Sequence, residues 1–312
     1  IIVEMKVRSA LFNQTSKALS EALGFDMIEY IASRVIDDYD IHKRMGIQEN
    51  IPITREMAAE RILRDVSSAG LFLPLVEQMI QVDLNGYMGR EYPIPRLSAI
   101  AKLIASEGFC YDRRSGLFME HAVNRVSPNW GRLVEGEEKQ VVLLRLDIVD
   151  NSGLVRKNSS VEVEKVYGAV REIVDRAVLS RHGRIWLWEG DGGMAAFLFS
   201  EKERSALFAG MEILHELFFY NRLHNTLSSP VSVRIAAHAG TINFSTNHSI
   251  LKKNETVKEL AELEARCTPN DTLSSSINVA VNADRSVRDR FGPDVQMHGY
   301  KFCRYTPGLE EV

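Results

Sequence analysis

The sequence predicts an α+β protein in which a mainly helical domain precedes a domain of mixed strands and helices. Over residues 1–126, apolar side chains recur at the three- and four-residue spacing of amphipathic helices. Residues 127–140 hold Pro128, two glycines and a run of charges, a composition typical of a linker. Over residues 141–312, apolar strand-like runs alternate with helical segments. A length of 312 residues also suits two domains of about 100–200 residues each.

The first domain is predicted to contain helices followed by a hairpin. In its first helix, apolar residues follow one another at helical spacing from Leu19 to Val35. In the second helix, Thr54 is placed to cap the N-terminus, shortly after Pro52. The predicted helices are Ser16–Asp37, a segment from Thr54 to Val66, Leu71–Val82 and Pro95–Ser106, and the hairpin spans Phe109–Phe118.

Short helices followed by a small hairpin resemble a winged-helix module. DNA contact would require several phosphate-binding cations on one face. The helix that would enter the groove carries Arg96 and Lys102, but Glu107 follows it directly. The chain has a net charge of −4 and a pI near 6.1, which provide no electrostatic footprint for nucleic acid. We therefore expect a regulatory or dimerisation domain at 1–126, without nucleic acid as a partner.

Cysteine usage and hydropathy indicate the compartment. Cys110, Cys267 and Cys303 lie far apart and form no CxxC pair, so neither a disulfide framework nor a zinc site is expected. No apolar run approaches the roughly 20 residues that span a bilayer. We expect a cytoplasmic protein without a membrane partner.

The second domain is predicted from strands and helices that follow one another in turn. Val141–Leu146 is a strongly apolar strand, and Ser160–Ser180 is an amphipathic helix. Strands alternating with helices, with two strands joined as a hairpin, indicate an α/β or α+β sandwich. The other predicted elements are the strands Gly183–Trp188, Met194–Ser200 and Val231–Ala237 and the helices Glu203–Leu223 and Val257–Arg266.

Two aspartates in this domain indicate a cation site. Asp147 leaves an apolar strand at its C-terminal end, and because an ionised carboxylate is costly to bury, it should face a cleft or a cation. Asp191 lies between glycines, which permit positive φ and let a ligand approach the backbone. On neighbouring strands, the two could hold divalent cations that bridge a triphosphate. An Asp-Gly turn by itself is also an ordinary hairpin turn.

Three segments, in order, resemble the motifs of class III adenylate and guanylate cyclases. That family carries a Phe-x-Asp-Ile-x-x-Phe-Thr segment, a Gly-Asp hairpin followed by Met-Ala-x-Phe, and an Arg-Ile/Val-Gly-x-His-x-Gly strand. This chain has Leu146-Asp-Ile148, then Gly190-Asp191 with Met194-Ala-Ala-Phe197, then Val233-Arg-Ile-Ala-Ala-His-Ala-Gly240. The resemblance covers about residues 141–305.

The resemblance implies a ferredoxin-like palm core, a head-to-tail homodimer and two Mg²⁺ or Mn²⁺ ions per site. Asp147, Asp191 and the carbonyl of Ile148 would be the metal ligands. Asn151 and Ser152, which end the segment after Asp147, would lie against a bound nucleoside triphosphate. The implied reaction is attack of the ribose 3′ hydroxyl on the α-phosphate, which gives a 3′,5′-cyclic nucleotide and pyrophosphate.

The residues that read the base and stabilise the transition state in the family differ in this chain. The purine-reading Lys falls on Leu187 and the base-reading Asp on Leu251. The ribose-orienting Asn falls on Lys258, and the transition-state Arg falls on Glu262. Lys258 and Arg266 are therefore the candidate catalytic cations, and the base preference is expected to be non-standard. A Lys258–Glu262 pair would also be an ordinary ion pair on a helix surface.

Two functions remain open from the sequence. One is an active nucleotidyl cyclase, which the presence of Asp147 and of the glycine-rich turn around Asp191 favours. The alternative is a catalytically degenerate cyclase-homology domain that acts as a nucleotide sensor or dimerisation unit in a signalling or transcription-regulating protein. His238 is predicted to be a packed histidine. Trp186 and Trp188 are predicted to share one face of their strand, in core or dimer packing.

Overall fold

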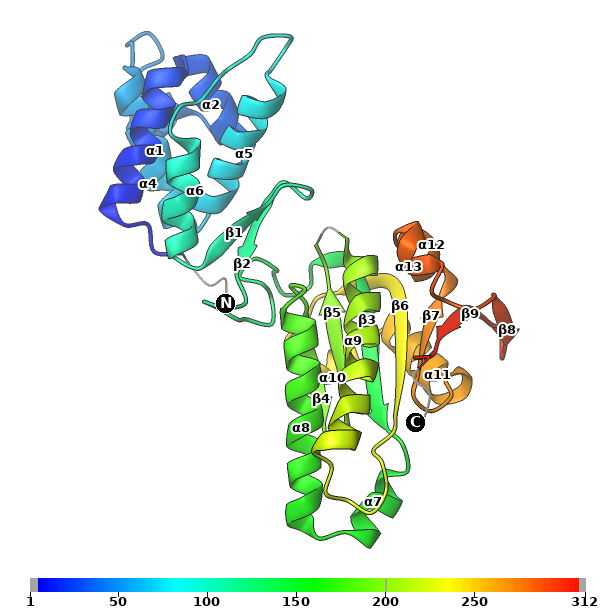
Figure 1. Ribbon diagram of the computed structural model, residues 1–312. Helices are drawn as coiled ribbons and strands as arrows, with labels where there is room; N and C mark the ends of the chain where they lie inside the picture. The colour runs from blue at the N-terminus through cyan, green and yellow to red at the C-terminus, as the bar shows by residue number, and fades with distance from the viewer. Residues whose placement is uncertain (1–4, 200, 309–312) are drawn as a thin grey trace. The chain divides into compact units, whose positions relative to one another are not determined.

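The computed structural model describes residues 5–199 and 201–308, which divide into two compact units (Figure 1). Unit 1 comprises the described residues up to 126 together with Trp130–Arg132. Unit 2 comprises Ser127–Asn129 and the described residues from Leu133 onward. Each unit has a hydrophobic core of its own.

Unit 1 is mainly helical, as its periodicity predicts. Ile28 and Ile31, for example, are fully buried in its core. The predicted helix Ser16–Asp37 is two helices, because Gly24 takes an extended backbone conformation between them (φ −75°, ψ 165°). The elements are α1 (Ser9–Ala22), α2 (Phe25–Ser33), α3 (Ile41–Met45), α4 (Arg55–Ser68), α5 (Phe72–Asn85), α6 (Leu97–Ser106), β1 (Phe109–Asp112) and β2 (Leu117–Glu120).

A buried carboxylate fixes the hairpin β1–β2 to the helices of unit 1. Glu77 of α5 is only 4% exposed and accepts a hydrogen bond from the Phe118 N–H at 2.6 Å. The same carboxylate forms an ion pair with Arg132 at 2.5 Å. A buried charge is tolerated when it is paired in this way. The hairpin is thereby held against α5, after the last helix of the unit.

Unit 2 is built on a seven-stranded sheet with the order β4-β5-β3-β6-β7-β9-β8. The central strand β3 (Glu138–Ile148) is antiparallel to both β5 (Gly192–Phe197) and β6 (Val233–Asn243). The chain order β3-α8-β4-β5-α9-β6 with this strand order is the ferredoxin-like arrangement. The predicted α+β palm is therefore confirmed.

Helices cover both faces of this sheet (Figure 1). α8 and α9 pack on one face, where Leu144, Leu146 and Ile148 of β3 enter the core. α11 packs against β3 and β6, and its residues are not part of that core. The further elements of unit 2 are α7 (Asn151–Lys157), α8 (Ser160–Leu179), β4 (Arg184–Glu189), α9 (Lys202–Leu223), α10 (His248–Leu251), α11 (Glu255–Cys267), β7 (Thr272–Ser276), α12 (Ile277–Asn282), α13 (Arg285–Arg288), β8 (Val295–Met297) and β9 (Tyr300–Tyr305).

The strand β3 is longer than predicted. It begins at Glu138 rather than Val141, because its partner β6 runs on to Asn243 and pairs with it over that length. On the other side of the sheet, β7 adds a strand parallel to β6, which the sequence pattern did not predict.

A β-bulge places the two tryptophans of β4 in different surroundings. The register between β4 and β5 shifts between Ile185 and Leu187, so strict alternation does not hold there. Trp188 packs against the core beneath α8, with the Arg171 guanidinium 4.5 Å from its ring. Trp186 packs on Phe244 and donates a hydrogen bond to the Pro128 carbonyl at 2.7 Å. The prediction that the two tryptophans share one face is wrong.

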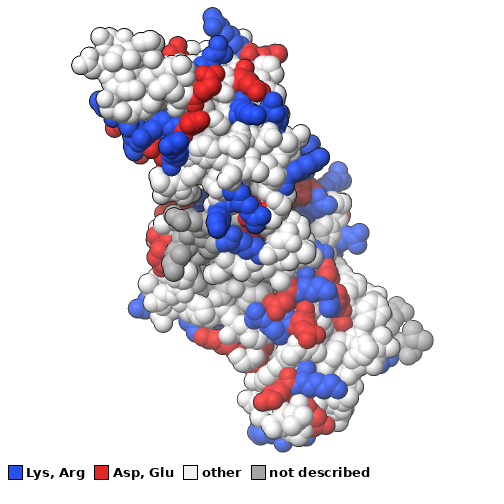
Figure 2. Space-filling model, turned by 90° about the vertical axis from the view of Figure 1, so that its left-hand side faces the viewer, with Lys and Arg blue, Asp and Glu red and all other residues white. Residues whose placement is uncertain are grey.

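The surface carries charges of both signs. Figure 2 shows Lys and Arg interspersed with Asp and Glu over the visible face. This mixture agrees with the small net charge of the chain. None of the helices in the described part of the chain combines the length and apolarity needed to cross a membrane.

Candidate functional site

The site is organised around Asp147 near the end of β3. Strand alternation sends Leu146 and Ile148 into the core under α8 and α9, so Asp147 lies on the opposite face. Its antiparallel partners are Gly192 on β5 and Arg234 on β6. The carboxylate therefore stands between a strand that offers no side chain and a strand that offers a cation. It keeps about a quarter of its side-chain surface exposed (24%).

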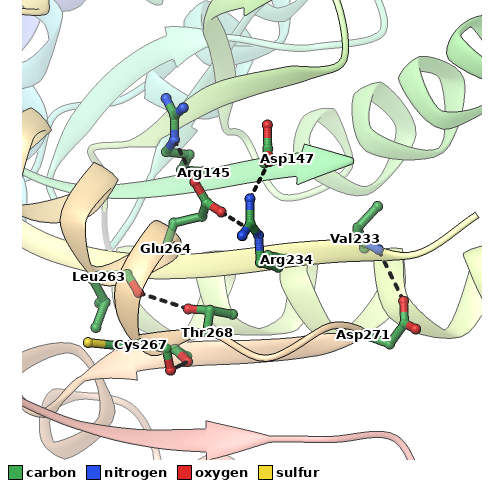
Figure 3. Close-up of polar contacts among 10 residues, drawn as sticks. Arg145, Asp147, Val233, Arg234, Leu263, Glu264, Cys267, Thr268 and Asp271 are labelled. Atoms are coloured by element: carbon green, nitrogen blue, oxygen red, sulfur yellow. Dashed lines mark hydrogen bonds and ion pairs between the residues drawn. The ribbon is translucent and has the colours of Figure 1, made fainter. Parts of the chain in front are cut away.

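An alternating chain of charges extends from Asp147 to α11 (Figure 3). One amino group of Arg234 lies 2.6 Å from Oδ2 of Asp147, and its Nε lies 2.9 Å from Glu264. The other oxygen of Glu264 accepts a hydrogen bond from Arg145 Nε at 3.2 Å. Glu264 is only 2% exposed, and burial raises the pKa of its carboxyl, with Arg234 acting in the opposite direction.

Gly192 lets β5 approach Asp147 closely. A Cβ atom at this position would lie 2.6 Å from the Leu146 carbonyl oxygen and 3.3 Å from Oδ1 of Asp147. A distance of 2.6 Å to a backbone atom cannot be relieved by a side-chain rotation, so glycine is required here. The second carboxylate oxygen of Asp147 thus lies beside bare backbone on the β5 side.

Backbone contacts hold Asp191 close to the end of β3. The Ile148 N–H donates a hydrogen bond to the Asp191 carbonyl at 3.2 Å. Gly190 precedes Asp191 with φ +57°, a conformation that suits glycine and turns the chain from β4 into β5. Burial raises the pKa of the Tyr167 hydroxyl on α8, and the nearby charge of Asp191 raises this pKa further. The structure therefore brings Asp147, Ile148 and Asp191 to one end of neighbouring strands.

Asp147 and Asp191 offer carboxylate oxygens, the donor type that hard divalent cations take in proteins. Mg²⁺ is usually held by one or two carboxylates together with waters and substrate phosphates, not by an all-protein cage. Among the described residues, no group of three or more His, Cys, Asp and Glu side chains could hold a metal ion. Asp147 and Asp191 provide two such carboxylates, and Gly192 adds no side chain between them.

Asn151 and Ser152 begin the short helix α7 directly after the aspartate strand. Tyr167 of α8 hydrogen-bonds to the side-chain oxygen of Asn151. The side chain of Asp150 accepts a hydrogen bond from the Gly153 N–H at 3.2 Å and caps the helix. The first turn of α7 is therefore fixed beside Asp147, where the sequence predicts contact with the nucleotide.

The two positions expected to face the base are apolar and buried. Leu187 of β4 is 6% exposed, and Leu251 at the end of α10 is 3% exposed. Lys252, which follows Leu251, and Glu189, two residues after Leu187, form an ion pair with distances of 2.6 and 2.7 Å. This pair connects the loop after α10 to the β4–β5 hairpin that carries Asp191. No charged side chain from these two positions is available to read a base edge.

The predicted catalytic cations are engaged in ion pairs within α11. Lys258 contacts Glu255 at 3.2 Å, and Arg266 contacts Glu262 at 2.7 Å. The prediction of a Lys258–Glu262 pair is wrong, because Lys258 pairs toward the start of the helix and Glu262 pairs toward its end. Both ion pairs lie on exposed helix surface, and neither includes Asp147 or Asp191.

Sequence reasoning missed Arg145 and Glu264. Glu264 lies in the apolar stripe of α11, where Val257, Leu260 and Cys267 are its buried neighbours. An acid in such a stripe requires a cation as a partner, so the position of Glu264 in the sequence could have predicted a buried ion pair. His238, by contrast, is largely buried and contacts Glu259 at 2.9 Å, as expected for a packed histidine.

Comparisons with known proteins concern unit 2. No protein-family model matches the sequence, and no curated protein matches it. Solved structures do. The second unit is similar to adenylyl and guanylyl cyclase domains. We call unit 2 the cyclase-like unit from here on.

Three of these structures illustrate the extent of the similarity. The guanylyl cyclase domain of RhoGC from the fungus Blastocladiella emersonii is 11% identical, with a TM-score of 0.47, over 55% of this chain and 97% of that chain. An adenylate/guanylate cyclase/hydrolase from Silicibacter pomeroyi is 20% identical (TM-score 0.45, 55% and 98% covered). The adenylyl cyclase CyaB from P. aeruginosa is 13% identical (TM-score 0.46, 57% and 100% covered). The roles of individual residues in the cyclase-like unit are argued below from its own geometry.

Proposed function

We propose that the cyclase-like unit binds a nucleoside triphosphate with divalent metal at Asp147 and Asp191 and converts it to a 3′,5′-cyclic nucleotide and pyrophosphate. The observation that supports this most is the pairing of the two aspartates at one end of neighbouring strands. The Ile148–Asp191 hydrogen bond joins the hairpin of Asp191 to the end of β3, and Gly192 lets the two strands approach closely beside Asp147. This arrangement suits a metal ion completed by phosphate oxygens.

Each residue near the aspartates has a task in this proposal. Bound Mg²⁺ or Mn²⁺ would neutralise phosphate charge and lower the pKa of the ribose 3′ hydroxyl. Asp147, Asp191 and the Ile148 carbonyl would hold it, and Asn151 and Ser152 would lie against the phosphates at the first turn of α7. The 3′ oxygen forms a bond to the α-phosphorus, the bond to the bridging oxygen of pyrophosphate breaks, and the hydroxyl proton leaves to water.

The base pocket is proposed to discriminate poorly. Leu187 and Leu251 are buried and apolar, and an apolar pocket separates bases less well than one with matched hydrogen-bonding groups. We also expect slow turnover, because Glu262 stands where the family places the transition-state Arg. Phosphoryl transfer consists mainly of positioning and charge neutralisation, so Lys258 or Arg266 could supply the missing charge only after leaving its ion pair.

The first experiment identifies the substrate. The full chain is incubated with each of the four NTPs and Mn²⁺, and cyclic monophosphates are detected by mass spectrometry. We expect slow product formation from more than one NTP and none from the Asp147→Asn variant. Fast cyclisation of ATP alone would show that the assignment of Leu187 and Leu251 to the base pocket is wrong.

A second experiment locates the catalytic cation. Arg266→Ala and Lys258→Ala are compared under the same conditions, since each removes one cation of α11 and breaks one surface ion pair. Loss of product in Arg266→Ala only would place Arg266 at the α-phosphate, and the reverse result would assign that role to Lys258.

The alternative function is a nucleotide sensor or dimerisation unit without turnover. A specific observation favours it: Lys258 and Arg266 are both engaged by acids of their own helix. For this case we expect Mn²⁺-dependent thermal stabilisation by an NTP with no cyclic product. In both cases unit 1 is proposed to be the regulatory or dimerisation part of the chain.

A further inference from the structure

Glu264 is the buried link between α11 and the metal-binding aspartate. Its side chain is 3% exposed, which is far less than that of either arginine it contacts (32% for Arg145, 28% for Arg234). Figure 3 shows Glu264 reaching from α11 toward the two strands, with Arg145 on β3 and Arg234 on β6. Only Arg234 continues to Asp147. The carboxylate of Glu264 is thus one residue removed from the proposed metal ligand.

The four side chains form a neutral set. Glu264 and Asp147 contribute two negative charges, and Arg145 and Arg234 contribute two positive charges. Glu264 is the buried member of this set, and the other three side chains keep about a quarter to a third of their surface exposed. Without the charge of Glu264, Arg145 would lose its acid partner and Arg234 would be paired with Asp147 alone. The region would then carry one additional positive charge beside the place where a cation has to bind.

The network also sets the orientation of Asp147. Arg234 holds Oδ2 on the β6 side at 2.6 Å. Oδ1 then lies on the β5 side, near Gly192 and the hairpin of Asp191. Glu264 in turn lies 2.9 Å from Nε of Arg234 without hydrogen-bond geometry, so the guanidinium is hydrogen-bonded to Asp147 and held by the charge of Glu264. The second oxygen of Asp147 therefore lies beside Gly192, the residue that follows Asp191 in the chain.

We propose that Glu264 is a positioning residue of the metal site: it holds Arg234 against one oxygen of Asp147 and balances its charge, so that the other oxygen can ligate a divalent cation. The inference rests on the proposed function, because it takes Asp147 to be a metal ligand. It adds a residue from α11, which supplies no ligand itself. A displacement of α11 would then change the affinity of the site for cation through Arg234.

The test measures Mn²⁺ binding by the nucleotide-free full chain, from the loss of the free-ion EPR signal. Glu264→Gln retains the volume of the side chain and removes its charge. We expect its Mn²⁺ affinity to be about tenfold lower, as a unit charge near a divalent ion would cause. Glu259→Gln is the matched control, because it removes the same charge from the same helix at a residue that contacts His238 instead. We expect its affinity to stay within about twofold of wild type, at the level of a partly exposed pair.

A second variant tests orientation separately from charge. Arg234→Lys retains the positive charge but lacks the planar fork that contacts Glu264 and Asp147 together, so we expect a fall in affinity of about fivefold. Thermal unfolding in EDTA would reveal whether Glu264→Gln folds. If it does not, the Mn²⁺ affinity of Arg234→Lys tests the proposal by itself. Folded variants that bind Mn²⁺ as tightly as wild type would overturn the role of Glu264 and leave the proposed function intact. A wild-type chain that binds no Mn²⁺ either alone or together with an NTP would overturn both.

Discussion

At the scale of single residues, the chemistry depends on how Asp147 is surrounded. Its three neighbours differ in kind: Gly192 offers bare backbone, Arg234 offers a cation, and the Asp191 hairpin offers a second acid. An isolated carboxylate on a strand would be an ordinary surface acid. Here the neighbouring strands determine which oxygen is paired and which is left for a ligand.

The aspartates provide the most direct prediction at this scale. Asp147→Asn and Asp191→Asn should each remove Mn²⁺-dependent NTP binding, because each replaces an anionic oxygen ligand of a hard cation with a neutral amide. Isothermal titration with Mn²⁺ and NTP checks this. Asp289→Asn, at an exposed pair with Arg285, is the control and should bind as the wild type does. Unchanged affinity in either site variant would disprove its assignment as a ligand.

Gly192 supports a second prediction. Gly192→Ala should weaken Mn²⁺ binding about tenfold or more and lower stability by about 1–3 kcal/mol, because the added Cβ would push β5 away from Asp147. Gly168→Ala on the exposed surface of α8 has nothing within 4 Å and should instead be neutral or stabilise by up to about 1 kcal/mol. Urea unfolding and Mn²⁺ titration of both variants separate the two effects. Equal behaviour of the two variants would contradict the close approach at Gly192.

At the scale of elements, α8 begins with a capping box that orients the helix beneath the site. The Ser159 hydroxyl accepts from the Glu162 N–H, and the Glu162 carboxylate accepts from the Ser159 N–H. These hydrogen bonds satisfy N–H groups that the helix itself cannot. The helix then places Tyr167 at Asn151 and Arg171 over Trp188. The beginning of α8 is therefore connected to the first turn of α7.

The capping box predicts a pH-dependent stability. Ser159→Ala should cost about 1 kcal/mol at neutral pH, as the loss of a Ser N-cap usually does. Hydrogen bonds from Ser159 lower the pKa of Glu162 below its ordinary value of 4.5. A lowered pKa stabilises the fold above the unfolded value and loses this effect as the pH falls through the folded value. The difference between variant and wild type should therefore shrink below pH 4.5 in chemical denaturation, and a constant difference would contradict the assignment.

At the scale of the whole molecule, we expect half of the proposed site to come from a second copy. In the cyclase-like unit, Asp147 lies on β3, Leu187 on β4, Asp191 in the turn between β4 and β5, and Leu251 on α10. In the head-to-tail arrangement that the sequence motifs imply, each copy would place its base pocket against the aspartates of the other. The site would then be complete only in the dimer.

We therefore predict that the protein is a homodimer. Light scattering should give about twice the mass of the 312-residue chain at micromolar concentration, in the range where a standard interface remains associated. If product forms, its rate per chain should fall on dilution below the dimer dissociation constant. A monomer with a dilution-independent rate would show that one chain contains a complete site.

Local pattern was sufficient for many of the elements and for choosing the two aspartates as candidates. The apolar run Val141–Leu146 predicts a strand, and the glycines around Asp191 predict a tight hairpin, because both depend only on near neighbours in the chain. The order of the motifs then predicts the ferredoxin-like palm, which the strand order confirms.

Long-range packing decided the rest. Arg145 and Glu264 are 119 residues apart, and nothing in local periodicity brings them together until α11 packs on β3 and β6. The β-bulge that places Trp186 and Trp188 in different surroundings depends on the pairing of β4 with β5. Spacing along α11 likewise does not determine that Lys258 pairs with Glu255 and not with Glu262. The sequence determined where the acids stand in the chain. Only the tertiary structure determined which cation each acid meets, because the energy of an ion pair depends on distance and burial in three dimensions.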